Sequence, residues 1–203
     1  MQTDKKQAIL HAALEEFFHK GYLGASTNQI IKSAGVSKGI LFHYFTDKRN
    51  LYLTVIDECM NYYFQALTSH LDKIPNDLFE AIEQLSKIKM EIFRSDPVKY
   101  GVIAKAFMTM PEEVRKELTR KQQQMNELVI PLLAAKIDRS CFRKEIAPEQ
   151  AIEFVLLSLE ALVARQMLKL QEGADEIEGA TAIEINQYVD MLKYGVYRRE
   201  ANE

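Results

Sequence analysis

The chain has 203 residues, of which 47% are hydrophobic and 27% charged, a balance typical of a globular protein with one or two domains. It contains no apolar run long enough to span a membrane, and its first ten residues, MQTDKKQAIL, lack the apolar core and cleavage site of a secretory signal. The net charge of −3 excludes a uniformly basic nucleic-acid-binding chain, and we expect a cytoplasmic protein without a membrane partner.

The first predicted helix begins at Asp4, which can cap it, and ends at Gly21. Apolar residues recur along it at helical spacing and give it one buried face: Ile9, Leu10, Ala13, Leu14, Phe17 and Phe18. His11 and His19 lie on the same helix without partners at metal-ligand spacing, so we interpret them as solvated or core residues. This helix is predicted to cover the two that follow.

Two short helices come next, joined by a turn that contains glycine. Ser26 and Gln29 have the spacing of a capping box at the start of the first helix, and Gly35 ends that helix in a left-handed conformation. Ser37 is expected to cap the second helix, which runs from Lys38 to Phe45. This arrangement is a helix-turn-helix, which can place its second helix in the major groove of DNA.

The second of these helices has two different faces. Leu41 and Phe45 lie four residues apart and are expected to pack inward. Lys38, Phe42 and His43 then face outward, and a solvated helix has little reason to expose an aromatic ring and an imidazole together. The pattern therefore favours contact with base edges and phosphates.

The run from Thr27 to Leu51, TNQIIKSAGVSKGILFHYFTDKRNL, resembles the DNA-binding domain of the tetracycline-repressor family (TetR/AcrR-type regulators). It has the family's Thr, Ala-Gly-Val, Ser-x-Gly, aliphatic-aromatic-x-Tyr-Phe and Phe-x-x-Lys-x-x-Leu elements, the last of them formed by Phe45, Lys48 and Leu51. With the preceding helix, the resemblance covers about the first quarter of the chain. It implies a repressor that binds a palindromic DNA operator as a homodimer and is released by a small-molecule effector.

The predicted DNA-binding residues lie in and around the helix-turn-helix: Thr27, Asn28, Ser37, Lys38, Gly39, Phe42, His43, Tyr44 and Lys48. Lys38 can donate to guanine, Gly39 lets the backbone approach closely, and Phe42, where many relatives carry Tyr, can contact a thymine methyl group. Thr27, His43, Tyr44 and Lys48 are expected at phosphates. For each residue, surface exposure or packing is the alternative.

A helix from Lys48 to about Leu71 is predicted to link two domains, a helix-turn-helix DNA-binding domain at residues 1–50 and a helical effector-binding and dimerisation domain at 51–203. The charge divides between them, with a net +3 in the first and −6 in the second. Further helices are expected at 76–94, 97–108, 111–138, 148–173 and in the C-terminal segment. Pro131 is expected to kink or break one of them.

The middle helices contain methionine and aromatic side chains, which adapt to irregular apolar shapes and suit a pocket for a lipophilic ligand. The predicted ligand-binding residues are Phe93, Tyr100, Phe107, Met108 and Met125. Ordinary core packing is the alternative for each of them. The chemical identity of the effector does not follow from the sequence.

The helix that begins at Pro148 is apolar nearly all round between Phe154 and Val163, which indicates burial on more than one side. By the family resemblance, the last two helices pair with those of a second subunit as a four-helix bundle. The predicted dimer-interface residues are Phe154, Leu159, Leu162, Val163, Tyr188 and Leu192. Burial within one subunit is the alternative.

The sequence contains no catalytic constellation, Gly-rich phosphate loop or Cys/His metal cluster, so we expect neither an enzyme nor a cofactor. Cys59 and Cys141 are the two cysteines and are expected to be free thiols, with a redox-sensor role as the alternative. Two other functions remain open: an enzyme that carries a helix-turn-helix domain, and an interaction module that binds a protein partner through residues 148–172. Repression and activation are not distinguished.

Overall fold

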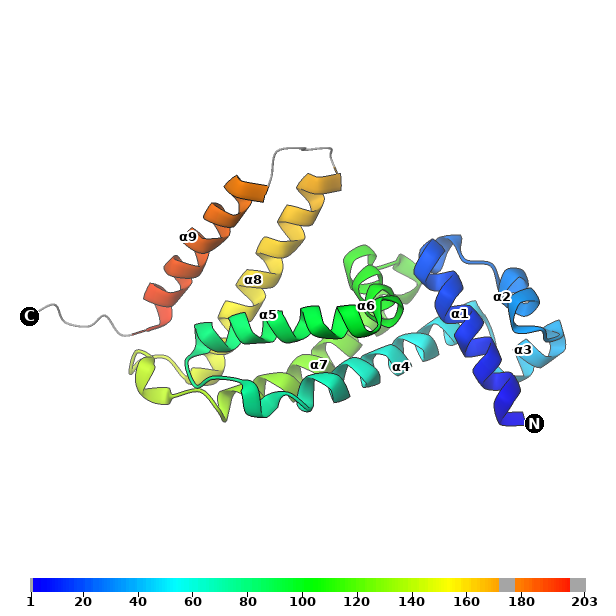
Figure 1. Cartoon of the computed structure of the whole chain (residues 1–203), viewed down its shortest axis with the longest axis horizontal. Helices are drawn as coiled ribbons and strands as arrows, with labels where there is room; N and C mark the ends of the chain where they lie inside the picture. Colours follow the sequence, from blue (N-terminus) through cyan, green and yellow to red (C-terminus); the bar gives the residue numbers. More distant parts are fainter. Residues whose placement is uncertain (1, 172–177, 198–203) are drawn as a thin grey trace, which may run out of the picture. The chain divides into compact units, whose positions relative to one another are not determined.

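A computed structural model describes residues 2–171 and 178–197, without the side chains of residues 2, 3, 160, 163–171 and 178–186. Within these ranges the regular elements are helices, apart from one isolated antiparallel bridge between Phe142 and Tyr197, so the predicted all-α class is confirmed. The α-helices (Figure 1) are α1 (Gln2–Gly24), α2 (Thr27–Ala34), α3 (Lys38–Tyr44), α4 (Lys48–Thr68), α5 (Leu78–Ser95), α6 (Pro97–Thr109), α7 (Arg115–Ala134), α8 (Pro148–Gln171) and α9 (Glu178–Val196). Short 3₁₀ turns η1 (Leu71–Lys73), η2 (Glu112–Val114) and η3 (Arg139–Cys141) lie between them.

The chain packs into two compact units. The first unit comprises the residues up to Asp72 together with Ser86–Gln124, and the second comprises Lys73–Leu85 together with the described residues from Met125 onward. Helices α5 and α7 each begin in one unit and end in the other. The division at residue 50 between a DNA-binding and an effector-binding domain is a functional one, and it stays a prediction.

The core of the first unit begins with the apolar stripe of α1. Ile9, Ala13 and Phe17 on this helix are buried, and so are Ile30 of α2 and Leu41 of α3. Full burial of a Leu, Ile or Phe side chain contributes about 1.5–3 kcal/mol. This stripe therefore holds α2 and α3 against α1, as the sequence predicted.

Three of the predicted helix caps are present. Ser37 Oγ accepts from the Ile40 N–H at 3.4 Å, and Asp47 Oδ1 accepts from the Asn50 N–H at 2.6 Å. Asp96 Oδ1 accepts from the Lys99 N–H at 3.0 Å at the start of α6. Gly35 has the expected left-handed conformation, with φ 63° and ψ 32°, so these local signals define the boundaries of α3, α4 and α6.

The predicted capping box at α2 is wrong. The Ser26 side chain makes no cap hydrogen bond, and Gln29 Nε2 donates instead to Ser33 Oγ at 3.3 Å. The first helix also differs, because it passes Gly21, whose φ of 64° interrupts the helical conformation, and continues to Gly24. The side chains of Ser26 and Gln29 therefore do not cap the N-terminus of α2.

The helix predicted over 111–138 is divided differently. Met110 closes α6 with φ 40° and ψ 63°, the one residue other than glycine with positive φ in the described chain. The 3₁₀ turn η2 follows Pro111, and α7 begins only at Arg115. Pro131 lies inside α7 without ending it, because it falls in the last turn, where it removes a single hydrogen bond.

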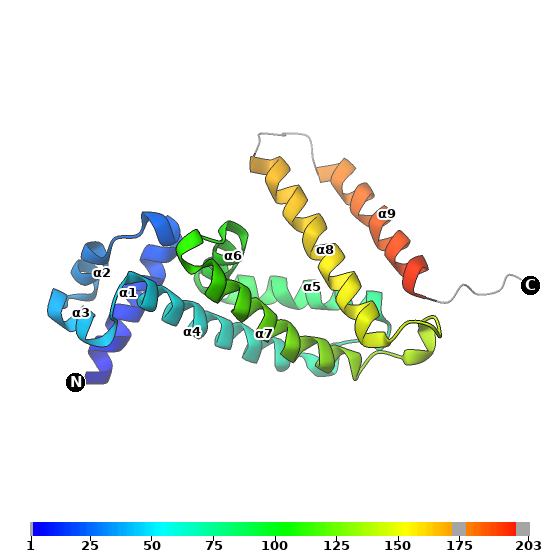
Figure 2. The same ribbon diagram turned by 180° about the vertical axis from the view of Figure 1, so that it is seen from behind.

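In the second unit, Tyr197 joins segments that are distant in sequence. Its hydroxyl accepts from the Leu78 N–H at 2.8 Å and donates to Asp77 Oδ2 at 2.9 Å. Its ring meets those of Phe79 and Phe142 edge to face. Helices α8 and α9 lie side by side (Figure 2).

Candidate nucleic-acid interface

Helix α3 presents the predicted reading face to solvent. Leu41 is fully buried beneath it, whereas Lys38 and His43 are exposed and Phe42 is 38% exposed. The Lys38 ammonium lies 5.9 Å from the centre of the Phe42 ring, so the two side chains share one surface. A cation and an aromatic ring side by side can meet a phosphate or guanine and a thymine methyl group, respectively.

Gly39 leaves the N-terminal turn of α3 without a side chain. A Cβ atom built at this position would have Ser37 Oγ as its nearest neighbour, at 4.0 Å. Packing within the chain therefore does not require glycine there. A close approach of another molecule to the backbone supplies a reason for it.

The remaining predicted residues of the two short helices lie around this face. Thr27 and Asn28 form the first turn of α2, with Asn28 exposed. The rings of His43 and Tyr44 stand edge to face at 5.2 Å, and Tyr44 is half-buried. The helix-turn-helix thus brings these residues together, while their contacts with DNA stay predictions.

Lys48 has partners within the chain that the sequence did not reveal. Its ammonium donates to the Leu23 carbonyl at 3.2 Å and lies 4.9 Å from the centre of the Tyr22 ring. Leu23 belongs to the last turn of α1, where the helix dipole favours a cation. Lys48 therefore links the start of α4 to the end of α1, in addition to its predicted contact with a phosphate.

The next residue, Arg49, is a second basic side chain that sequence reasoning missed. Its Nε donates to the Glu113 carbonyl at 3.0 Å, and its Nη2 forms an ion pair with Glu117. A second ion pair joins Asp57 of α4 to Lys121 of α7. These contacts fix the first turns of α4 against η2 and the start of α7.

Helix α6 contacts α1 directly, which the sequence also did not predict. A Cβ atom on Gly101 would lie 2.5 Å from Phe18 Cε2, so the Phe18 ring occupies the space that glycine leaves. Lys105 Nζ donates to the Phe18 carbonyl at 2.8 Å. We call these three residues, Phe18, Gly101 and Lys105, the α1–α6 contact.

Of the predicted ligand-binding residues, Phe93 and Tyr100 lie together, with ring centres 5.5 Å apart. Tyr63 of α4 stands beside Tyr100 at 6.2 Å, and burial raises the pKa of both tyrosines. Phe107 is half-buried and Met108 is 54% exposed. Met125 belongs to the second unit, and the role of all five residues in ligand binding stays a prediction.

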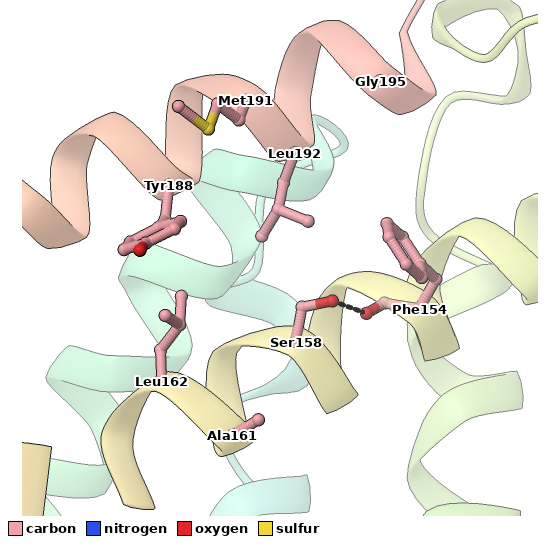
Figure 3. Close-up of a pocket in the computed structure, with 8 residues that line it drawn as sticks. All are labelled: Phe154, Ser158, Ala161, Leu162, Tyr188, Met191, Leu192 and Gly195. Carbon is pink, nitrogen blue, oxygen red and sulfur yellow. Dashed lines mark hydrogen bonds between the residues drawn. The ribbon is translucent and has the colours of Figure 1, made fainter. Parts of the chain in front are cut away.

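Helices α8 and α9 form an open apolar groove of about 510 Å³ (Figure 3). Four of the predicted dimer residues line it, namely Phe154, Leu162, Tyr188 and Leu192. Leu159 is half-buried, and the Val163 side chain lies outside the described residues. Phe154 is 55% exposed and Met191 67% exposed, so the described residues leave the groove open.

In the described part of the chain, no three His, Cys, Asp or Glu side chains are grouped so that they could hold a metal ion. Burial raises the pKa of Cys59 to about 12 and also raises the pKa of Cys141, so both are protonated thiols near neutral pH, whereas the thiolate is the reactive form. None of the described helices is long and apolar enough to cross a membrane.

Comparison with known proteins finds similarity to bacterial regulators. The family of bacterial regulatory proteins named tetR matches residues 9–55. The HTH-type transcriptional regulator RutR of Escherichia coli K12 is 34% identical over 93 residues, which cover 46% of this chain and 43% of RutR. The chain therefore matches less than half the length of that relative.

A longer match is found with the HTH-type transcriptional repressor AcnR of Corynebacterium glutamicum, 24% identical over 98% of this chain and 95% of AcnR. The solved structure of the fatty acid degradation regulator FadR of Bacillus halodurans has a similar fold, with a TM-score of 0.64, 21% identity, and coverage of 96% of this chain and 97% of FadR. The match of residues 9–55 coincides with the core of α1 and with α2, α3 and the start of α4. Residues 9–55 thus match the tetR family of bacterial regulatory proteins, and the fold of the chain is similar to that of FadR.

Proposed function

We propose that this protein is a DNA-binding transcriptional regulator of the repressor type. The observation that carries the proposal is the outer face of α3, where Lys38, Phe42 and His43 are exposed above the fully buried Leu41. A helix fixed from beneath, with a cation and aromatic groups outward, fits the major groove. The names of RutR and AcnR support the same function.

Selection of bound sequences from random DNA tests the proposal. The expected result is a palindrome whose half-sites lie about one helical turn, roughly 34–36 Å, apart. Recovery of random sequences, with binding that depends on salt alone, would contradict sequence-specific regulation. The position of the recovered operator relative to a promoter distinguishes repression from activation.

The proposed regulator acts as a homodimer. The groove between α8 and α9 supports this, because its apolar lining, with Phe154 and Met191 more than half exposed, lies where a second copy could cover it. Exposed apolar patches of this kind mark sites of association. Two copies related by a twofold axis would present two α3 helices to a palindromic site.

Release by a small, largely apolar effector completes the proposed function. The aromatic group of Tyr63, Phe93 and Tyr100 supports an apolar effector. The first unit offers two routes from these side chains to the helix-turn-helix. One is α4, which is continuous from Lys48 to Thr68, and the other is the α1–α6 contact, because Tyr100 and Gly101 are adjacent on α6.

An interaction module is the second candidate function, and the same open groove favours it. In that case a different protein, and not a second copy, would cover α8 and α9. Sedimentation of the purified chain separates the two, since a regulator of the proposed type is a dimer on its own. An enzyme that carries a helix-turn-helix domain would require turnover of a substrate, which the proposal predicts to be absent.

A further inference from the structure

Glu16 is the buried charged residue of the described chain. It is 9% exposed and lies on α1 directly before the core residue Phe17. Its Oε1 accepts from the Ser26 N–H at 3.0 Å and lies 3.3 Å from Lys20 Nζ. Burial of a carboxylate is costly unless hydrogen bonds compensate, so the Ser26 N–H and the Lys20 ammonium account for how Glu16 can be buried.

The Ser26 N–H belongs to the N-cap residue of α2. In a capping box, the side chain three residues into the helix reaches back to this N–H. Here Gln29 holds that position, but its side chain is turned to Ser33. Glu16 therefore supplies from α1 the hydrogen bond that α2 does not make for itself.

This bond gives α2 a fixed starting point on α1. Ile30 also joins the two helices through apolar burial, but apolar packing is not directional. A hydrogen bond to a carboxylate is short and directional, and it acts on the residue directly before Thr27. The bond thus adds a directional link between α1 and the N-cap residue of α2 to the apolar contact of Ile30.

We propose that Glu16 is a positioning residue for operator binding, which holds Thr27 and Asn28 where they meet the DNA backbone. This inference rests on the proposed function, and it adds a role for a side chain that does not itself touch DNA. Glu16 acts through the Ser26 N–H, and Lys20 offsets its charge. Neither residue lies on the exposed face of α3.

The proposal and simple electrostatics predict opposite changes in operator affinity when the Glu16 carboxylate is removed. Removal of a carboxylate near DNA lowers repulsion from the phosphates and raises affinity. Removal of a positioning bond lowers affinity. Glu16→Leu, which keeps the apolar bulk and removes the acceptor, is therefore the informative substitution.

The experiment measures operator affinity at one fixed salt concentration for the full chain and three variants. We expect Glu16→Leu to bind about tenfold more weakly, which corresponds to the loss in helix stability when a capping bond is removed falling wholly on the DNA-bound state. Glu16→Gln retains an acceptor oxygen and is expected to bind within about twofold of the unmodified chain. Glu15→Leu removes a neighbouring carboxylate that pairs with His19 and is expected to bind equally or more tightly.

Replacement of single operator phosphates by methylphosphonate separates positioning from general loss of folding. The unmodified chain is expected to bind the operator more weakly when the phosphate opposite α2 is replaced, and also when a phosphate opposite α3 is replaced. For the Glu16→Leu variant, replacement of the phosphate opposite α2 should no longer change the operator affinity, whereas replacement of a phosphate opposite α3 should still lower it. An equal loss at every phosphate, or affinity equal to or above that of the unmodified chain, would overturn the proposal.

Hydrogen exchange in the unmodified chain gives a test that needs no variant. The Ser26 amide is expected to be protected in free protein, and fast exchange there would refute the bond on which the inference depends. Failure of the unmodified chain to select any operator would instead refute the proposed function. The two failures are therefore distinguishable.

Discussion

At the scale of single residues, the proposed DNA face combines side chains that are free to meet a ligand with others that are already engaged. Lys38 touches Phe42 on an open surface, whereas Lys48 donates to a carbonyl at the end of α1. The same residue type therefore has different consequences at two positions. Substitutions at the two sites should affect folding and DNA binding in different proportions.

Gly39→Ala tests whether the backbone of α3 approaches DNA. The position has room for a methyl group, and alanine favours a helix over glycine by up to about 1 kcal/mol. We therefore expect unchanged or higher thermal stability together with weaker operator binding, as measured by melting and titration. Unchanged affinity would show that Gly39 does not face the operator.

Lys48→Met tests the double role of the Lys48 ammonium. Methionine keeps an apolar stem near Tyr22 but has no charge, so binding to all DNA sequences should weaken alike. The slope of log affinity against log salt should fall by roughly 0.9 per subunit if one phosphate contact is lost. A lower melting temperature with an unchanged slope would assign Lys48 to the link with Leu23 alone.

At the scale of elements, local signals predicted most helix boundaries. Ser37, Asp47 and Asp96 each cap a helix through a bond to a residue three positions away, which a sequence pattern contains in full. The contacts that orient the helices were not predictable in this way. Glu16 and Ser26, Lys48 and Leu23, and Lys105 and Phe18 are 10, 25 and 87 residues apart, and their pairing depends on how helices pack.

The candidate site also has some features that the sequence predicts and others that depend on how the helices pack. The outward position of Lys38, Phe42 and His43 follows from helical spacing once Leu41 is assigned to the core. The predicted ligand residues were chosen for composition alone. Composition does not determine which of them meet, and Phe93 and Tyr100 are the pair that the structure brings together.

Gly101→Ala tests the α1–α6 contact. The added methyl group would overlap the Phe18 ring, and overpacking of this kind typically costs about 1–3 kcal/mol. We expect a lower melting temperature and weaker operator binding, because α1 or α6 must move. Both effects should be partly reversed by Phe18→Leu in the same chain.

Gly195→Ala is the matched control for this substitution. Gly195 lies in helix α9, and a Cβ atom there would meet nothing within 4 Å. Helix propensity alone predicts equal or higher thermal stability, which is the quantity compared, because Gly195 lines the groove proposed as the dimer interface. If Gly101→Ala lowers the melting temperature no more than Gly195→Ala does, steric contact of the added methyl group with Phe18 is excluded.

At the scale of the whole molecule, DNA binding and association are expected to depend on each other. Leu162→Glu places a charge in the apolar groove between α8 and α9, where an unpaired charge is costly if a second copy covers it. Sedimentation should then show a folded monomer, and operator affinity should fall because one helix-turn-helix meets one half-site. Gln150→Glu adds the same charge at an exposed position of α8 and should leave the dimer intact.

The two ends of α6 limit how this helix can change when an effector binds. Asp96 precedes Pro97 and Met110 precedes Pro111, and a residue before proline disfavours the helical conformation. Neither end can therefore recruit a further turn, and α6 keeps its 13 residues, a rod of about 20 Å. When an effector binds, α6 can therefore be displaced as a rod or fray at its last turn, but it cannot lengthen. If α6 is the element that responds, far-ultraviolet circular dichroism should show constant or reduced helix content when an effector binds, and a gain would mean that helix forms elsewhere in the chain.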